Sequence, residues 1–278
     1  MIKFPFWRSQ QLQRASDTPL PPPPRPKRDT ILERAIARDA ISVAFQPQIE
    51  PGSGRIVGVE ALARWDGETN PEKLFARAAA SGLGERLSRT VQRRALREVG
   101  KWKGPLAALR LSINLIPEDL TRDGYVGWLL DEIAAAGLQP ERVTIEITES
   151  SLIADQKAAA ARLACLRAAG VQIAIDDFGT GYSSLAYLTT LPLDTLKIDR
   201  ALIADLVGGS RDRIVVRAMI RLARELNLKV IVEGVETEAQ RELLAEWGCD
   251  LYQGFLGAKA LDEDALLAFI GASTAIAA

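Results

Sequence analysis

Beyond about residue 30, short apolar runs alternate with longer segments in which apolar residues recur every three or four positions. Apolar runs of a few residues are typical of buried strands, whereas the three-to-four spacing predicts amphipathic helices. We therefore predict strands over residues 43–46, 56–63, 109–114, 142–147, 172–176, 195–198, 229–233 and 251–253. We predict helices over residues 85–102, 124–136, 155–169, 212–226, 238–247 and 263–270, and a first helix for which Thr30 is the expected cap.

The repeated strand–helix order predicts an α/β fold with parallel strands and helices outside them. About eight strands in a chain of 278 residues favour a TIM (β/α)8 barrel over an open doubly wound sheet. Only residues 50–55 join the first two predicted strands, and a crossover connection does not fit into so short a turn. We therefore predict a modified barrel whose first strand is antiparallel.

The first 29 residues differ from the rest of the chain. Six of the eight residues from Pro19 to Pro26 are prolines, a composition that favours an extended polyproline segment over a packed one. We predict a disordered proline-rich tail over residues 1–29, acting as a linker or as a docking segment for an unknown partner. Since no comparable linker follows, residues 30–278 are predicted to form one domain.

Composition narrows the possible functions. Apolar residues make up 47% of the chain, enough for a large core, and the formal net charge of −1 gives no electrostatic footprint for a nucleic acid polymer. The absence of histidine excludes Ser-His and Cys-His triads and imidazole ligands to zinc. We predict that the only cysteines, Cys165 and Cys249, are buried core thiols.

The expected location follows from the same sequence. Two cysteines in a chain of this length fit a reducing compartment. No apolar run reaches the roughly 20 residues of a transmembrane segment, and the first residues lack the apolar segment of a secretory signal. We therefore predict a cytoplasmic protein.

Two adjacent carboxylates, Asp176 and Asp177, end an apolar run and are followed by a loop of Gly, Thr and Ser over residues 178–185. A turn at the end of the strand would bring both carboxylates to one site, where they repel each other unless a cation or a proton intervenes. A flexible loop that follows directly can close over a ligand. This pattern predicts a metal site with a lid.

Polar residues stand at or near the ends of most predicted strands: Glu60, Asn114, Glu146, Asp176, Asp177, Lys197, Glu233 and Gln253. In a barrel these ends converge on one face, where catalytic groups lie. Any one of them alone fits a solvated strand end or a salt-bridged core charge. Because one lysine does not neutralise five carboxylates, we predict a divalent metal site with oxygen ligands, and two metals about 3.5–4 Å apart suit phosphoester hydrolysis.

At these residues the chain resembles the EAL-domain family of cyclic di-GMP phosphodiesterases. The motifs stand in the family's order: Gln46-Pro47, Glu60-Ala61-Leu62-Ala63-Arg64-Trp65, Ser112-Ile113-Asn114, Glu146-Ile147-Thr148-Glu149-Ser150, residues 176–185, Lys197-Ile198-Asp199-Arg200, Glu233-Gly234-Val235-Glu236-Thr237 and Gln253-Gly254. The resemblance covers residue 30 to the C-terminus and implies a barrel whose first strand is antiparallel. The chain departs from the family pattern after Trp65, at Val232, and at Gly257 and Ala260.

The resemblance also implies roles for individual residues. One metal ion would be bound by Glu60, Asn114, Glu146 and Asp176, and a second by Asp177. Glu233 and Lys197 would position or activate the attacking water, and Glu60 is counted with them as a catalytic residue. Gln46, Arg64 and Gln253 would hold the substrate, and Glu149, Glu236 and Asp199 would support the site and the loop after the aspartate pair.

The implied reaction is hydrolysis of cyclic di-GMP to linear pGpG by a water that two Mg²⁺ or Mn²⁺ ions activate, with Ca²⁺ expected to inhibit. The resemblance also implies a homodimer. Three alternatives stay open: a catalytically silent cyclic di-GMP receptor, a barrel enzyme acting on a sugar phosphate, and a protein-interaction module that docks through the proline-rich tail.

Overall fold

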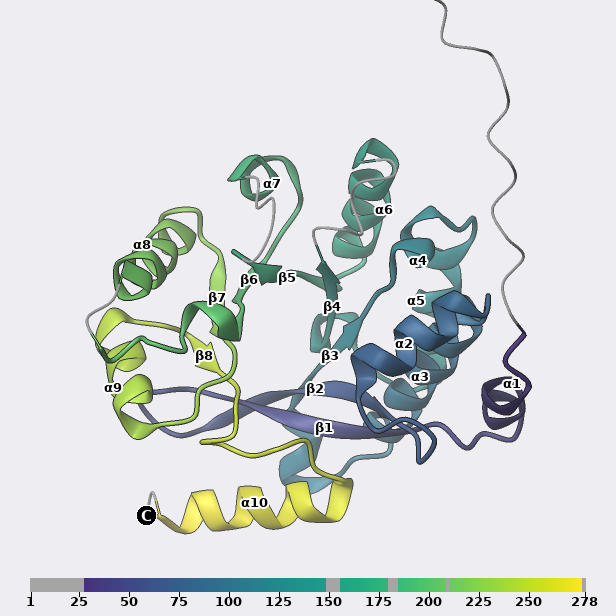
Figure 1. Cartoon of the computed structure of the whole chain (residues 1–278), viewed down its shortest axis with the longest axis horizontal. Coiled ribbons are helices and arrows are strands. Elements are labelled where there is room, and N and C mark those ends of the chain that lie inside the picture. Colours follow the sequence, from purple (N-terminus) through teal and green to yellow (C-terminus); the bar gives the residue numbers. More distant parts are fainter. Residues whose placement is uncertain (1–27, 149–155, 180–184, 209–210, 277–278) are drawn as a thin grey trace, which may run out of the picture.

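The computed structural model describes residues 28–148, 156–179, 185–208 and 211–276, and within them the strands β1 to β8 close into a barrel in chain order (Figure 1). The strands are β1 (Ser42–Ile49), β2 (Ile56–Arg64), β3 (Arg110–Asn114), β4 (Val143–Thr148), β5 (Gln172–Phe178), β6 (Thr195–Ile198), β7 (Lys229–Val232) and β8 (Leu251–Tyr252). The predicted α/β barrel is confirmed.

Strand β1 runs antiparallel to both of its neighbours, β2 and β8, whereas every other neighbouring pair is parallel. The cause is the short connection, because β1 ends at Ile49 and β2 begins at Ile56. This pairing sets Gln46 opposite Glu60, so that two residues predicted to face one site are neighbours across the sheet.

Helices surround the ring of strands, and the C-terminal helix lies outside the barrel beside β1 (Figure 1). The helices are α1 (Thr30–Ala37), α2 (Pro71–Ala80), α3 (Gly84–Val99), α4 (Pro117–Thr121), α5 (Tyr125–Ala135), α6 (Gln156–Ala168), α7 (Leu185–Thr190), α8 (Arg211–Glu225), α9 (Glu238–Trp247) and α10 (Glu263–Ile276), with 3₁₀ turns at Gly104–Ala108, Pro140–Arg142 and Arg200–Leu202. In the described part of the chain, no helix combines the length and the apolar content that a membrane span requires.

Helix α3 illustrates how the helices attach to the barrel. Leu87, Val91 and Ala95 recur at helical spacing, and all three are buried. Fully burying a leucine side chain contributes about 1.5–3 kcal/mol relative to leaving it exposed. Apolar faces of this kind provide the main driving force that packs the helices on the barrel.

The structure corrects several predictions about single elements. Thr30 is the first helical residue of α1, and the cap is Asp29, whose Oδ1 accepts hydrogen bonds from the backbone N–H groups of Ile31 and Leu32. Cys165 is exposed, because it lies off the buried face of α6, whereas Cys249 is buried as predicted.

Helices α2, α4 and α7 were not predicted. The last two have five and six residues, too few for a periodicity to emerge. Helix α2 did carry a local signal, because Asn70 caps it through the backbone N–H of Lys73 and Pro71 occupies its first position.

Part of the predicted organisation lies outside the described residues. This holds for residues 1–27 of the predicted tail and for residues 180–184 of the predicted lid. The division into a tail and one domain at residues 29 and 30 therefore stays a prediction. Asp29 itself already belongs to the folded part, as the cap of α1.

Asp29 yields a stability prediction, because it caps α1 and pairs with Arg77 of α2, which lowers the pKa of Asp29 to about 2. We expect Asp29→Ala to lower the free energy of unfolding by about 1 kcal/mol, the usual effect of losing a helix cap. Urea unfolding at pH 7 measures this change. Arg28→Ala is the control, since its pair with Glu33 is exposed, and an equal loss in both variants would contradict the role of the cap.

Candidate active site

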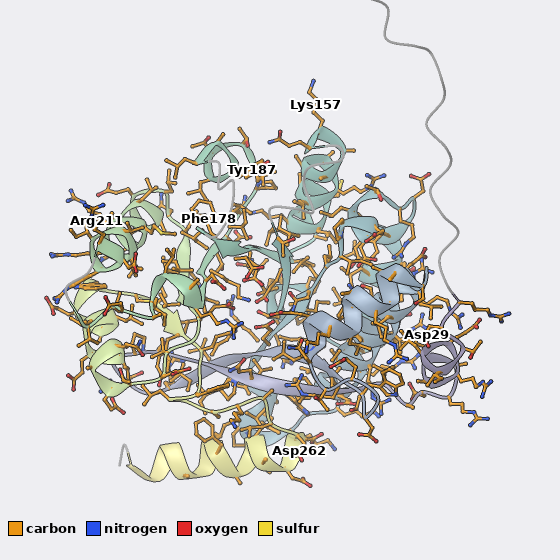
Figure 2. All side chains as sticks on the ribbon, in the orientation of Figure 1. Asp29, Lys157, Phe178, Tyr187, Arg211 and Asp262 are labelled. Carbon is orange, nitrogen blue, oxygen red and sulfur yellow. The ribbon has the colours of Figure 1, made fainter. Side chains whose placement is uncertain are left out.

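The centre of the site is Lys197, whose side chain is fully buried on β6. Its ammonium nitrogen contacts one carboxylate oxygen from each of four residues: Glu146 at 2.7 Å, Glu233 at 2.8 Å, Asp176 at 3.1 Å and Glu60 at 3.5 Å. These carboxylates come from β4, from the residue after β7, and from β5 and β2. The barrel thus brings these predicted strand-end residues to one point. Figure 2 draws the side chains of the described residues on the ribbon, including those that fill the ring of strands.

Two side-chain amides complete this cluster. Gln253 Nε2 donates to Glu60 Oε2 at 2.7 Å and to Glu233 Oε1 at 2.9 Å. Asn114 Nδ2 donates to Glu60 Oε1 at 2.8 Å. Burial opposes ionisation of Glu60, but Lys197 and these two amides together hold the pKa of Glu60 below its ordinary value. Glu60 is therefore the most firmly ionised carboxylate of the cluster.

The other carboxylates have raised pKa values. Burial raises the pKa of Glu233 to about 8, and burial followed by the charge of Glu60 raises the pKa of Glu146 well above its ordinary value. The pKa of Asp176 also rises, chiefly through burial. Burial alone would lower the pKa of Lys197, but the surrounding carboxylates raise it well above its ordinary value. The cluster therefore carries more acidic groups than its one ammonium can neutralise.

The donor set fits a hard divalent cation. Glu146 Oε1 is buried and has no hydrogen-bond partner among the described residues, although its other oxygen pairs with Lys197. An uncompensated buried carboxylate oxygen is costly, and coordination by a cation compensates for it. Carboxylate and amide oxygens are the ligands that Mg²⁺, Mn²⁺ and Ca²⁺ prefer.

Asp176 and Asp177 reach the same space because the backbone is irregular at the end of β5. The pairing of β5 with β6 shifts register between Ile175 and Phe178, as in a β-bulge, and Asp177 has a left-handed φ of 55°. A regular strand would direct the two side chains to opposite faces. Here the backbone N–H of Asp177 donates to Asp176 Oδ1 at 2.9 Å.

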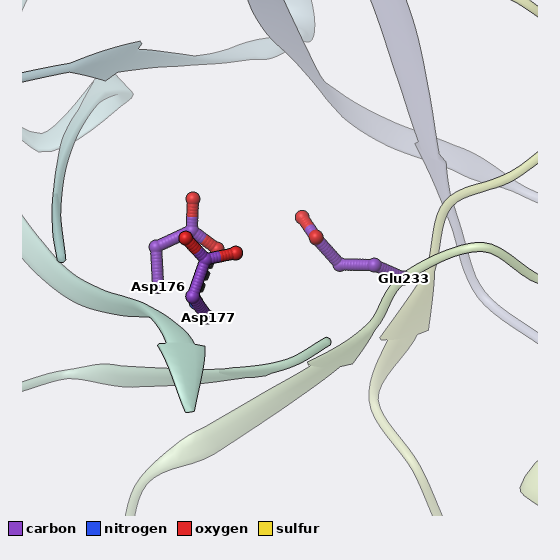
Figure 3. A group of neighbouring side chains, drawn as sticks. All are labelled: Asp176, Asp177 and Glu233. Carbon is purple, nitrogen blue, oxygen red and sulfur yellow. Dashed lines mark hydrogen bonds between the residues drawn. The ribbon is translucent and has the colours of Figure 1, made fainter. Parts of the chain in front are cut away.

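Asp176, Asp177 and Glu233 form an acidic group that can hold a metal ion, with one oxygen from each lying within 4.8 Å of the others. Figure 3 shows the carboxylate of Glu233 pointing toward the aspartate pair. Burial, and next the charge of Asp176, raise the pKa of Asp177 to about 6. Asp177 is the exposed member of the group, whereas Asp176 is buried and Glu233 is partly buried.

A cavity of about 830 Å³ opens above this cluster. The predicted site residues among its lining are Gln46, Glu60, Arg64, Asn114, Asp176, Asp177, Asp199, Glu233, Glu236 and Gln253. Glu146 and Lys197 are fully buried next to these residues. Gln46 Nε2 donates to the carbonyl of Ala258 at 3.3 Å, and Arg64 to the carbonyl of Ala63 at 2.8 Å, so both are held at the cavity wall. Glu149, also predicted as a supporting residue, lies outside the described residues.

The backbone of Gln253 and Gly254 lies close to the backbone of Val235, and this contact fixes the position of Gln253. Its carbonyl accepts from the N–H of Val235 at 3.1 Å, and the next residue, Gly254, lies so near that a Cβ would collide with the backbone of Val235. Only glycine fits there, which explains the pair Gln253-Gly254 in physical terms.

The sequence reasoning missed two parts of the cavity wall. One is the start of α2, with Asn70, Glu72 and Phe75, for which the Asn-Pro helix start was the available signal. The other is the pair Ser88 and Gln92 on α3, both buried. Two polar residues on the otherwise apolar face of a predicted helix indicated that this face contacts polar groups as well as the apolar core.

Comparisons with known proteins agree with this geometry. A family model described as the EAL domain matches residues 29–260. A Pseudomonas aeruginosa protein described as the bifunctional diguanylate cyclase/cyclic di-GMP phosphodiesterase MucR is 38% identical over 244 residues, covering 86% of this chain and 36% of the relative. The cyclic di-GMP phosphodiesterase NbdA of the same species is 38% identical over 248 residues, covering 87% of this chain and 31% of the relative. The chain thus spans about a third of the length of these curated relatives.

Solved structures give the same result. The phosphodiesterase of MucR in complex with c-di-GMP matches with a TM-score of 0.79 and 37% identity, covering 85% of this chain and 98% of that one. Klebsiella pneumoniae BlrP1, solved with cyclic di-GMP and either calcium or manganese, matches with a TM-score of 0.73 and 35% identity, covering 80% of this chain and 56% of that one.

The raised pKa values predict how pH affects the metal-free protein. A carboxyl group whose pKa is raised by folding stabilises the fold below its unfolded value, and this contribution is lost as the pH rises through the folded value. For Glu233 this stabilising contribution is lost between about pH 4.5, the ordinary pKa, and about pH 8, the pKa in the folded protein. We therefore expect the melting temperature in EDTA to fall across this window, and added Mn²⁺ to stabilise the protein more at pH 8 than at pH 5.

Scanning calorimetry at both pH values measures this difference, and Glu233→Gln serves as the control because it removes the titrating group. The variant should show a flatter pH dependence. A metal-free melting temperature that rises steadily from pH 5 to pH 8 would contradict the prediction.

Proposed function

The chain belongs to the EAL domain family, and from this premise we propose that it hydrolyses cyclic di-GMP to linear pGpG with the help of two divalent cations, Mg²⁺ or Mn²⁺. The observation that carries the proposal is the floor of the cavity, where buried carboxylates outnumber the single ammonium of Lys197. Such an excess of buried acidic groups suits divalent cations, which can in turn bind a phosphodiester, better than it suits a structural core.

Two groups of residues would hold the cations. The first group is Glu60, Asn114, Glu146 and Asp176, and it includes the unpartnered oxygen of Glu146. The second position lies beside Asp177, whose neighbours Asp176 and Glu233 supply further oxygens. When bound, the cations supply Lewis acidity toward the phosphodiester and its leaving oxygen. Ca²⁺, with longer and more variable bonds, is expected to bind without supporting turnover.

Glu233 and Lys197 would hold the attacking water. A carboxyl group with a pKa near 8 suits proton transfer at neutral pH, because a general base works best when its pKa lies near the working pH. In the proposed reaction the water oxygen forms a bond to phosphorus and gives its proton to Glu233. The bond from phosphorus to the ribose 3′ oxygen breaks, that oxygen takes up a proton from solvent, and Glu233 returns its proton to solvent.

The cavity suits a ligand with two phosphates and two bases. Its volume of about 830 Å³ lies within the range of about 300–1,000 Å³ that small-molecule sites occupy. Arg64 supplies a half-buried cation at the cavity wall, and Gln46 and Gln253 supply amide groups. Guanidinium and amide donors suit phosphate oxygens and guanine edges.

A cyclic di-GMP receptor without catalytic activity is the competing function. Such a receptor would need the cavity but not the full set of acidic groups around Lys197. The chain has that set, together with the bulged aspartate pair, and this favours the enzyme.

Substituting a predicted ligand of either metal ion tests the proposed hydrolysis directly. We expect Glu60→Gln and Asp177→Asn each to lower the turnover of cyclic di-GMP by at least about a hundredfold, because each variant removes charge that would hold a cation at the reacting phosphate. Chromatography of the product pGpG in the presence of Mn²⁺ or Mg²⁺ measures the loss. Cys165→Ser is the control, since Cys165 is exposed on α6 away from the cavity lining. A wild-type chain that binds cyclic di-GMP without forming pGpG would support the receptor instead.

We also propose a homodimer that forms through the region of α7 and α8. Large apolar side chains are exposed there: Leu185 at 60%, Val207 at 51%, Ile214 at 71% and Val215 at 42%. Exposed apolar groups in one region of a protein favour association with another surface. Because α7 follows the loop after Asp177, contacts there would connect the subunit interface to the metal site.

A charge in this region should prevent the dimer. We expect Ile214→Asp to produce a monomer, because it would bury an unpaired carboxylate at the interface. Light scattering measures the mass, and Ile31→Asp is a matched control, since Ile31 is 65% exposed on α1, at the opposite side of the barrel from α8 (Figure 1). A wild-type monomer, or a monomer for both variants, would contradict the proposed interface.

We further propose a cytoplasmic location, which suits the free thiols of Cys165 and Cys249. The proline-rich tail as a docking segment for another protein stays a prediction.

A further inference from the structure

A second buried polar cluster begins at the cavity wall and lies between α3 and the segment that follows β3. It consists of Ser88 and Gln92 on α3, Asp119 on α4 and Tyr125 on α5, all with at most 1% of their surface exposed. The proposed reaction uses none of these residues. Four polar side chains buried together, one of them a carboxylic acid, are costly unless their hydrogen bonds are satisfied.

Gln92 is the centre of this cluster. Its Nε2 carries two hydrogens and has three acceptors within hydrogen-bond distance, of which two share one hydrogen: the backbone carbonyl of Asn114 at 3.0 Å, Asp119 Oδ2 at 3.1 Å and Ser88 Oγ at 2.9 Å. Its Oε1 accepts from the hydroxyl of Tyr125 at 3.0 Å. The carbonyl of Asn114 can only accept, so it requires the NH₂ group of Gln92 on its own side and leaves Oε1 toward the Tyr125 hydroxyl, which donates to it.

Asp119 anchors the same segment from the other end. Its Oδ2 accepts from the Ser88 hydroxyl at 2.6 Å and from the backbone N–H of Ile116 at 3.3 Å, and its Oδ1 lies 3.3 Å from Arg122. Burial raises the pKa of Asp119 above its ordinary value, which shows that its position is costly. Apolar residues of similar volume often replace a buried charge without loss of stability, so a second reason for the cluster is needed.

The position of Asn114 supplies that reason. Asn114 ends β3, and its carbonyl is the acceptor for Gln92. The next residue, Leu115, donates its N–H to the carbonyl of Glu146 at 2.9 Å. On the side of the cavity, Asn114 Nδ2 donates to Glu60 Oε1, which turns the amide oxygen away from that carboxylate oxygen. The hydrogen bond from Gln92 therefore fixes the backbone position of Asn114, from which its side chain extends. The hydrogen bond to Glu60 fixes the rotation of the side-chain amide.

We propose that Gln92 is a positioning residue for the cation site, which holds Asn114 in the place where its side-chain oxygen can act as a metal ligand. This inference rests on the proposed function, since it assigns Asn114 to a metal. Partners that orient metal ligands typically change metal affinity or activity by about 10- to 100-fold when they are lost. Gln92 would act in this way through a backbone carbonyl, without contact to substrate.

The test compares Mn²⁺ binding by the wild type and by Gln92→Met, which keeps the length of the side chain and removes its amide. Electron paramagnetic resonance counts free Mn²⁺ and needs no turnover. We expect the Mn²⁺ dissociation constant to rise about tenfold. We expect the KM for cyclic di-GMP at saturating Mn²⁺ to stay unchanged, and kcat to recover as Mn²⁺ is raised.

Val99→Ala is the matched control, because Val99 is buried on the same helix two turns further on. Val99→Ala should lower the melting temperature and leave Mn²⁺ affinity unchanged. If Gln92 has a purely structural role, Gln92→Met should likewise lower the melting temperature and leave Mn²⁺ affinity unchanged. Tyr125→Phe removes the donor to Gln92 Oε1 and keeps the hydrogen bond from Gln92 to the Asn114 carbonyl, so we expect a smaller change in the same direction. It also carries the test if Gln92→Met does not fold.

Unchanged Mn²⁺ affinity in Gln92→Met, or in Tyr125→Phe if only that variant folds, would overturn the inference. A wild type that binds no Mn²⁺ would overturn it as well. A wild type that binds Mn²⁺ without hydrolysing cyclic di-GMP would instead remove the proposed reaction, and the comparison of Mn²⁺ affinities would still decide the role of Gln92.

Discussion

The buried ammonium of Lys197 is the contact on which the site depends. It holds carboxylates that arrive from β2, β4, β5 and the end of β7, and it therefore fixes the relative positions of these strands at one end of the barrel. Taking such ions out of water costs several kcal/mol each, and a single ammonium recovers only part of that cost. Because of this excess of acidic groups, the region contributes little to the stability of the core and is well suited to bind cations.

That site is formed by the closed barrel and by a local irregularity in the backbone of β5. The parallel strands β2 to β8 bring their ends to one face, and the antiparallel β1 closes the ring and sets Gln46 beside Glu60. Neither feature brings two adjacent aspartates together. The register shift at the end of β5 and the left-handed backbone of Asp177 do so, at a conformational cost that is typical of functional sites.

Support for the site extends beyond the residues at the cavity. Helix α3 packs on the barrel through an apolar face, and the same helix carries Gln92 to the carbonyl of Asn114. A buried hydrogen-bond network is rigid because each member limits the orientation of the next. Such rigidity suits a metal ligand, because losing a partner that orients a ligand typically lowers metal affinity or activity by about 10- to 100-fold.

Much of the fold followed from local patterns. Apolar periodicity indicated the strands and the longer helices, and the short turn before Ile56 required an antiparallel first strand. The polar residues at the strand ends indicated an acidic site, because parallel strands in a barrel must end together. The short helices α4 and α7 were missed because a few residues carry no periodicity, and the helical pattern around Cys165 did not show that this residue faces outward.

The sequence by itself therefore determined the barrel and the acidic residues of its active end, since both depend on patterns that neighbouring residues carry. Only the tertiary structure decided that, among the residues it describes, Lys197 contacts four carboxylates, Glu146 keeps an oxygen without a hydrogen-bond partner and Gln92 reaches Asn114. These contacts join residues far apart in the chain. Their distances, and the burial that raises the pKa of Glu233, exist only after the strands have closed into a ring.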